Sequence, residues 1–152
     1  MVKVLVLTGY GVNCDEETAF AFKKAGAEAK IVHVNDLIKK PGQLKDFQIF
    51  AFPGGFSYGD NTGSGNALAN KMRNMLWQDI MEFVDQKKLV IGICNGFQVI
   101  VNLGLLPGID GKYGERTVAL APNNSARYEC RWVSMKGVSK KCVFTKGIEN
   151  IR

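Results

Sequence analysis

The stretch Leu89-Val90-Ile91-Gly92-Ile93-Cys94-Asn95-Gly96-Phe97-Gln98 sets a cysteine between two glycines, directly after a short apolar run. Such a run is typical of a buried strand, here expected over 89–93, and a helix is expected from about 95 to 103. A strand, a sharp turn and a helix in this order predict a nucleophile elbow, in which small residues must flank the nucleophile and its side chain is lifted above the sheet. Cys94 is therefore the candidate catalytic residue.

The start of the expected helix provides groups that suit this chemistry. Exposed amide N–H groups and the positive end of the helix dipole would stabilise a thiolate at Cys94. Attack on a carboxamide also needs donors for the oxyanion that forms, and the backbone N–H groups of Asn95 and Gly55 are the candidates. The alternatives are a buried structural cysteine and, for Pro53-Gly54-Gly55, a simple loop turn.

Apolar runs and amphipathic segments alternate along the first hundred residues. Asn13 and Glu16 resemble a capping box, so a helix is expected from about Cys14 to Ala25, and a long amphipathic helix is expected from Leu68 to Val84. Further strands are expected over 2–7, 29–34 and 48–52. The alternation predicts an α/β fold with an open, doubly wound, mostly parallel sheet of flavodoxin-like type, in strand order 2-1-3-4.

The pattern changes after Pro107. Shorter runs over 117–121, 128–133 and 142–145 are expected to form short antiparallel strands joined by turns. Trp77 and Trp132 are expected in a core or an interface.

Length and composition limit the class of protein. The 152 residues are enough for about one domain, and 46% hydrophobic with 22% charged residues is the balance of a soluble globular protein. No apolar run approaches the roughly 18 residues of a spanning helix, so we expect a cytoplasmic protein without a membrane partner. Four cysteines without a C-x-x-C pair, and a single histidine, argue against a metal site.

The net charge of +6 comes from 20 Lys and Arg against 14 Asp and Glu. Most of the excess lies between residues 127 and 152, a segment that contains seven basic and two acidic residues. This segment lacks the interleaved aromatic residues of a surface that binds single-stranded nucleic acid. We therefore expect a solvated or partner-facing surface rather than a nucleic-acid site.

The run from Gly92 to Gln98 resembles the nucleophile motif of class I (triad) glutamine amidotransferases, in which a glutamine four positions after the cysteine helps to bind substrate glutamine. More narrowly, four separated blocks resemble the glutaminase components of phosphoribosylformylglycinamidine synthases, and the resemblance extends to about Val133. These blocks cover residues 11–15, 52–60, 94–107 and 122–133.

The resemblance implies that Cys94 forms a γ-glutamyl thioester and releases ammonia. It implies a separate synthetase (large) subunit as a partner, and it allows a small accessory subunit. The synthetase uses ATP and magnesium to convert formylglycinamide ribonucleotide to formylglycinamidine ribonucleotide in purine biosynthesis. No cofactor is expected on this chain, because it has no P-loop motif. The candidate glutamine-binding residues are Gly54, Phe97, Gln98, Asn123 and Ser125, although for the last two a surface turn is an equal alternative.

The resemblance also implies a histidine and an acidic residue in a carboxyl-terminal portion that this sequence does not contain. His33, the only histidine, would end the second strand, about 14 Å from the fourth, and is expected to be structural. We therefore expect residues 1–152 to be a single incomplete amidotransferase domain with little activity alone. Cys14 is expected to pack or cap.

Two other readings stay open. One is another cysteine hydrolase on the same fold, such as an intracellular peptidase or deglycase, although these lack the glutamine at position 98 and the block over 122–133. The other is a non-catalytic flavodoxin-like binding module, because this sequence lacks the histidine and the acidic residue of a triad.

Overall fold

The computed structural model describes residues 1–137, 141–148 and 150–151. The chain divides into two units, Met1–Leu120 and Ala121–Arg152, and each is considered by itself. Three charged residues of the predicted basic surface lie outside the described residues, namely Lys140, Glu149 and Arg152. Among the described residues, no helix is long and apolar enough to cross a membrane.

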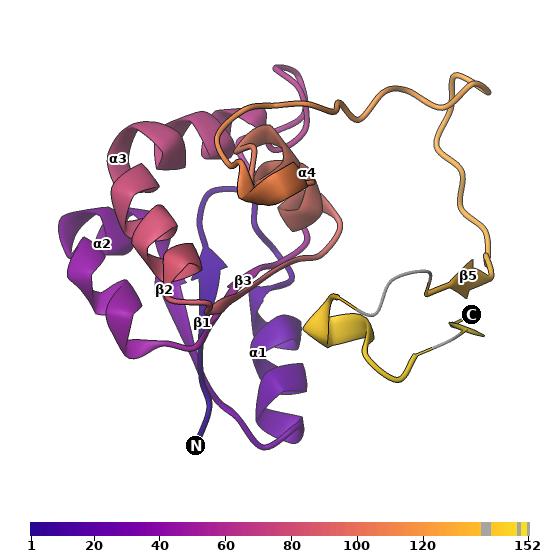
Figure 1. The fold of residues 1–152 in the computed structure, drawn as a ribbon. Coiled ribbons are helices and arrows are strands. Elements are labelled where there is room, and N and C mark those ends of the chain that lie inside the picture. The colour runs from indigo at the N-terminus through magenta and orange to yellow at the C-terminus, as the bar shows by residue number, and fades with distance from the viewer. Residues whose placement is uncertain (138–140, 149, 152) are drawn as a thin grey trace. The chain divides into compact units, whose positions relative to one another are not determined.

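The first unit is built on a four-stranded sheet in which every neighbouring pair is parallel (Figure 1). The strand order is β2-β1-β3-β4, which confirms the predicted order. Because β3 and β4 are neighbours and run the same way, the loop after Phe52 and the elbow after Gly92 emerge at the same edge of the sheet. The strands are β1 (Lys3–Thr8), β2 (Glu28–His33), β3 (Ile49–Phe52) and β4 (Leu89–Gly92).

Helices cover both faces of this sheet, which confirms the doubly wound α/β class. Successive strand residues point to opposite faces, so Val4 and Val6 pack with Ala19 of one helix, whereas Leu5 and Leu7 belong to a larger core on the other face. The helices are α1 (Asp15–Lys24), α2 (Val34–Lys39), α3 (Asn66–Asp85) and α4 (Asn95–Asn102), with 3-10 turns η1 (Pro41–Asp46) and η2 (Ile109–Gly111).

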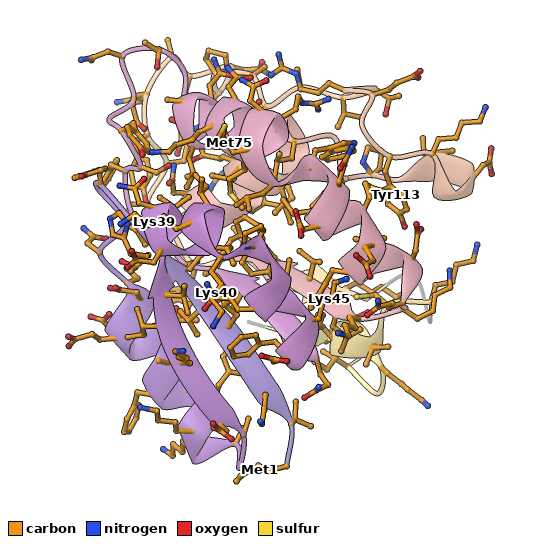
Figure 2. The ribbon with its side chains drawn as sticks, turned by 90° about the vertical axis from the view of Figure 1, so that its left-hand side faces the viewer. Met1, Lys39, Lys40, Lys45, Met75 and Tyr113 are labelled. Atoms are coloured by element: carbon orange, nitrogen blue, oxygen red, sulfur yellow. The ribbon has the colours of Figure 1, made fainter. Side chains whose placement is uncertain are left out.

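Helix α3 supplies much of the larger core, as its apolar repeat predicts. Met72, Leu76 and Ile80 are buried, but Met75 is 56% exposed, so the buried stripe is narrower than the apolar pattern (Figure 2). On α2 and η1, the same view shows Lys39 and Lys45 directed to solvent at the surface.

Two local predictions around the helix starts are wrong. Helix α1 has no capping box, because it begins at Asp15 with Cys14 at the N-cap, and the Asn13 side chain accepts from the Cys14 thiol at 3.4 Å instead of capping the helix. Val34 was expected to end the second strand, but it begins α2. The imidazole Nδ1 of His33 accepts the Asn35 N–H at 3.1 Å and so ends the strand one residue early.

The predicted strands over 117–121 and 128–133 are wrong, and residues 143–145 form a 3-10 turn, η3 (Val143–Thr145), instead of a strand. Apolar alternation forms a strand only where a partner strand and a core are present, and Leu120 and Trp132 are 52% and 83% exposed. Trp132 therefore lies in no core of the described residues. Two short antiparallel strands do occur toward the C-terminus, but at residues where none was expected, β5 (Met135–Lys136) and β6 (Asn150–Ile151).

Candidate active site at the Cys94 elbow

Cys94 lies at the junction of β4 and α4 in a backbone conformation that residues other than glycine rarely adopt. Its backbone angles are φ 52° and ψ −112°, and its side chain is exposed. Such a conformation costs on the order of 1–3 kcal/mol and persists only when the surrounding structure enforces it, often at functional sites. The elbow geometry thus agrees with the prediction, and the alternative of a buried structural cysteine does not fit.

The two glycines that flank Cys94 are what make the turn possible. A Cβ atom on Gly96 would lie 1.9 Å from the carbonyl oxygen of Phe52, and one on Gly92 would lie 2.7 Å from the carbonyl oxygen of Gly96. Both distances are far shorter than a van der Waals contact, so only glycine fits at either position. The start of α4 therefore packs directly against the backbone of β3.

The segment Pro53-Gly54-Gly55 runs beside the elbow. The position of a Cβ on Gly54 is 3.5 Å from the Cys94 Cβ, whereas a Cβ on Gly55, at φ 148°, would collide with the Gly11 carbonyl oxygen at 2.5 Å. The Phe56 N–H donates to that same oxygen at 2.7 Å. This segment is thus held between the loop after β1 and the start of α4.

Two backbone donors are available at this place. The Gly54 carbonyl accepts from the N–H groups of Asn13 and Cys14, at 3.3 and 3.2 Å. Because a trans peptide directs its C=O and N–H oppositely, the Gly55 N–H points away from that loop. Within the described residues, neither this N–H nor that of Asn95 donates to a protein acceptor. Their role as an oxyanion hole stays a prediction.

The first turn of α4 also carries three side chains at the elbow. Phe97 is 40% exposed and Gln98 is half-buried, so both are accessible, whereas Asn95 is only 2% exposed. The Asn95 Oδ1 accepts the Ser57 N–H at 3.0 Å, and its Nδ2 donates to the Gln98 Oε1 at 3.2 Å. The sequence pattern indicates a role only for the backbone N–H of Asn95, and it contains no signal for the role of this side chain.

A comparison with protein families agrees with this arrangement. The model of the family described as the CobB/CobQ-like glutamine amidotransferase domain matches residues 1–152. The chain belongs to this family.

Individual relatives place this amidotransferase domain more narrowly and confirm the resemblance seen in the sequence. It is 61% identical, over 148 residues, to the phosphoribosylformylglycinamidine synthase subunit PurQ of Methanococcus maripaludis (strain S2), covering 96% of this chain and 54% of that one. It is 49% identical, over 151 residues, to the subunit of that name in Dehalococcoides mccartyi, covering 99% and 58%. The chain spans about half the length of the curated relatives it matches.

A solved structure supports the same fold. The structure of PurLQS from Thermotoga maritima superposes with a TM-score of 0.68 at 32% identity, covering 88% of this chain and 54% of that one. The flavodoxin-like class I amidotransferase fold predicted from the sequence is thereby confirmed.

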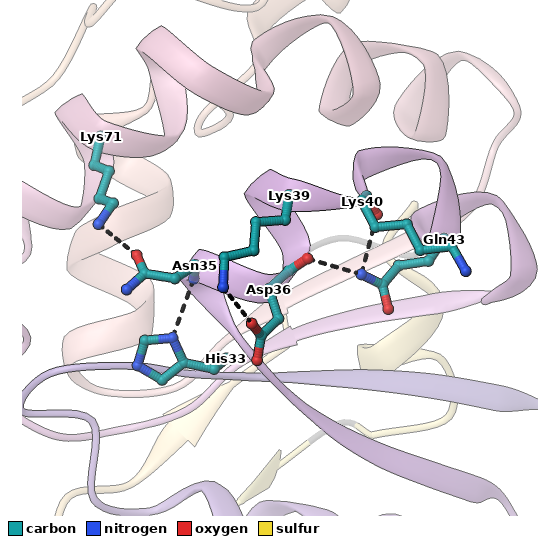
Figure 3. A network of polar contacts seen from close by, with 7 residues as sticks. All are labelled: His33, Asn35, Asp36, Lys39, Lys40, Gln43 and Lys71. Atoms are coloured by element: carbon teal, nitrogen blue, oxygen red, sulfur yellow. Dashed lines mark hydrogen bonds and ion pairs between the residues drawn. The ribbon is translucent and has the colours of Figure 1, made fainter.

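The single histidine of these 152 residues, His33, does not lie near Cys94. His33 caps α2 by accepting the Asn35 N–H, and the side-chain Oδ1 of Asn35 accepts from Lys71 Nζ at 2.7 Å (Figure 3). His33 ends β2, and two strands, β1 and β3, lie between β2 and β4. At the usual strand spacing, His33 is therefore about 14 Å from β4. This agrees with the structural role expected for it. Among the described residues, no three or more His, Cys, Asp or Glu side chains gather as metal ligands would.

The second cysteine near the elbow has a structural setting. Cys14 is half-buried at the N-cap of α1, and its Sγ lies 3.5 Å from the Cβ position of Gly54. Its carbonyl oxygen accepts the Thr18 hydroxyl at 2.6 Å. Cys14 was expected to pack or to cap; it packs beside Gly54, but its side chain makes no capping hydrogen bond.

The remaining candidates, Asn123 and Ser125, belong to the second unit. Asn123 Nδ2 and Ser125 Oγ both donate to the Arg127 carbonyl oxygen, at 3.0 and 3.4 Å, and so form a local turn. That Asn123 and Ser125 bind glutamine stays a prediction, and a surface turn without such a role is the alternative.

Proposed function

We propose that this protein is the glutaminase subunit of a phosphoribosylformylglycinamidine synthase and that Cys94 is its nucleophile. The observation that carries the proposal is the strained, exposed Cys94 between two obligatory glycines, beside two backbone N–H groups that have no acceptor among the described residues. The names of the relatives supply the pathway, because they are called subunits of that synthase.

The chemistry follows from this arrangement. The Cys94 thiolate attacks the side-chain carboxamide carbon of glutamine, and the Gly55 and Asn95 N–H groups stabilise the oxyanion. When the tetrahedral intermediate collapses, the C–N bond breaks, the nitrogen takes a proton, and ammonia leaves a γ-glutamyl thioester. Water then attacks the thioester, releasing glutamate and restoring the thiol.

Substrate glutamine is held by groups around the first turn of α4 in this proposal. The Gly54 backbone lies beside the thiol, and the accessible side chains of Phe97 and Gln98 project from the same turn.

The histidine and the carboxylate that complete such a triad come from outside these 152 residues, because His33 is the only histidine and ends a distant strand. Loss of a triad member commonly costs on the order of 10⁴-fold in rate. Residues 1–152 alone are therefore an incomplete amidotransferase domain with little or no glutaminase activity.

The ammonia is consumed by a synthetase subunit that binds ATP and magnesium, with a small accessory subunit as a further partner, in the cytoplasm. The similarity to the PurLQS structure supports an assembly of this kind. A different cysteine hydrolase is the second candidate function, but Gln98, four residues after Cys94, and the names of the relatives favour glutamine as the substrate.

Glutamate release from glutamine tests the proposal. The natural protein is assayed with its synthetase, and Cys94→Ser is compared with Cys14→Ser, the matched change at the other thiol beside Gly54. We expect Cys94→Ser to abolish glutamate release and Cys14→Ser to retain most of it. Unchanged release by Cys94→Ser would overturn the proposal.

A further inference from the structure

Asn95 is an unusual residue for its position. Cys94, its neighbour, is exposed, but the Asn95 side chain is 2% exposed. A buried amide is costly unless its donors and acceptors are bonded. Its two hydrogen bonds, to Ser57 and to Gln98, therefore fix the side chain firmly in place.

The bond to Ser57 joins two segments that are distant in sequence. Ser57 lies two residues after Gly55 and is itself fully buried, and its N–H reaches the Asn95 Oδ1 across 38 residues of chain. On its other side the segment is bound to the loop after β1 through the Phe56 N–H. The Asn95 side chain thus connects the two backbone segments that carry the N–H groups of Gly55 and Asn95, neither of which has an acceptor in the part of the chain that the structure describes.

The bond to Gln98 follows from the first one. A backbone N–H can only donate, so Asn95 must present its oxygen to Ser57 and its NH₂ group to Gln98. Gln98 must then present its own oxygen to Asn95. Its NH₂ group has no hydrogen-bond partner among the described residues and is left as a donor for an oxygen of a ligand.

We propose that Asn95 is a positioning residue, whose side chain fixes both the separation of the two oxyanion donors and the orientation of the Gln98 amide. This inference rests on the proposed glutaminase function. It assigns Asn95 a role beyond its backbone N–H, and that role depends on the amide having one acceptor and one donor end.

Two substitutions separate the two bonds. Asn95→Ala removes both, whereas Asn95→Asp keeps an acceptor for Ser57 but has no donor for Gln98. Gln98 would then turn its NH₂ group to the carboxylate and its oxygen to the substrate. The matched control is Asn102→Ala, because Asn102 also lies on α4 and makes two side-chain hydrogen bonds, to Ser64 and Arg116, at the opposite end of the helix.

The experiment compares two labelling rates at Cys94 of the natural protein by peptide mass spectrometry. Diazo-oxonorleucine, a glutamine analogue, reports recognition and the oxyanion site, whereas iodoacetamide reports the accessible thiolate alone. We expect Asn95→Ala to slow the analogue roughly 10- to 100-fold, while iodoacetamide changes less than about 2-fold. Asn95→Asp should slow the analogue as much as Gln98→Ala, and the double substitution Asn95→Asp with Gln98→Ala should slow it no further.

Three results would overturn the inference. These are analogue labelling of Asn95→Ala at the wild-type rate, equal slowing of both reagents by Asn95→Ala, and equal slowing of the analogue by Asn102→Ala. Failure of the proposed function looks different, because the wild-type protein would then react with iodoacetamide at Cys94 but not with the glutamine analogue.

Discussion

The Cα of Gly96 faces the carbonyl oxygen of Phe52 so closely that a Cβ there would stand 1.9 Å from that oxygen. This contact joins α4 to β3 and fixes where Cys94 stands. In Gly96→Ala, the new methyl group must move the backbone of α4 away from that of β3. We therefore expect the free energy of unfolding to fall by about 3 kcal/mol, the upper end of the range usual for overpacked cores. Urea denaturation measures it.

Gly42→Ala is the control for that prediction, since a Cβ on Gly42 meets nothing within 4 Å. Its unfolding free energy should stay within about 1 kcal/mol of wild type. Equal stability of the Gly96→Ala and Gly42→Ala variants would contradict the packing described for the elbow.

His33 should be dispensable for the proposed glutaminase activity, measured on the natural protein together with the proposed synthetase subunit. It caps α2 through the Asn35 N–H, so His33→Ala should cost about 1 kcal/mol in unfolding free energy. His33→Asn restores a capping oxygen and should recover most of that stability. Glutamate release by both variants should stay within about 2-fold of wild type, because a triad histidine would instead cost on the order of 10⁴-fold.

The ion pair between Lys45 and Glu82, at 2.9 Å, gives a pH dependence at the alkaline end. The hydrogen bond and charge of Glu82 raise the pKa of Lys45 above its usual value. Because the folded-state pKa is the higher one, this stabilisation is fully present below the unfolded pKa and is lost as the pH rises through the folded one. Both side chains are about half exposed, so the effect is small and screened by salt.

Melting temperatures between about pH 9 and pH 12 check this. Lys45→Met should flatten part of the alkaline decline at low salt, and the difference from wild type should shrink at high salt. An identical decline in both proteins would show that the pair contributes nothing.

The sequence was sufficient where the signal is local. Apolar runs predict the four strands, and the glycines around Cys94 predict the elbow, because the turn itself demands small residues. The role of the Asn95 side chain depends on Ser57, 38 residues away, and no local pattern contains that pairing. Helix α2 as a whole is not predicted from the sequence, because a histidine caps it and histidine is not among the strongly preferred capping residues.

The errors beyond Pro107 have another cause. Val118 and Leu120 repeat as in a strand, but both are about half exposed and pair with no strand among the described residues. Period-two alternation indicates a strand only where a sheet is present to complete it.

Acid-quench trapping of an acyl-enzyme tests the central claim most directly. The natural protein, together with the proposed synthetase subunit, is mixed with glutamine and quenched during turnover, and its peptides are analysed by mass spectrometry. A γ-glutamyl group on the peptide that contains Cys94, and none on the peptide that contains Cys14, is the expected result. Turnover of glutamine by the Cys94→Ser protein, or a glutamyl group found on Cys14 instead, would contradict it.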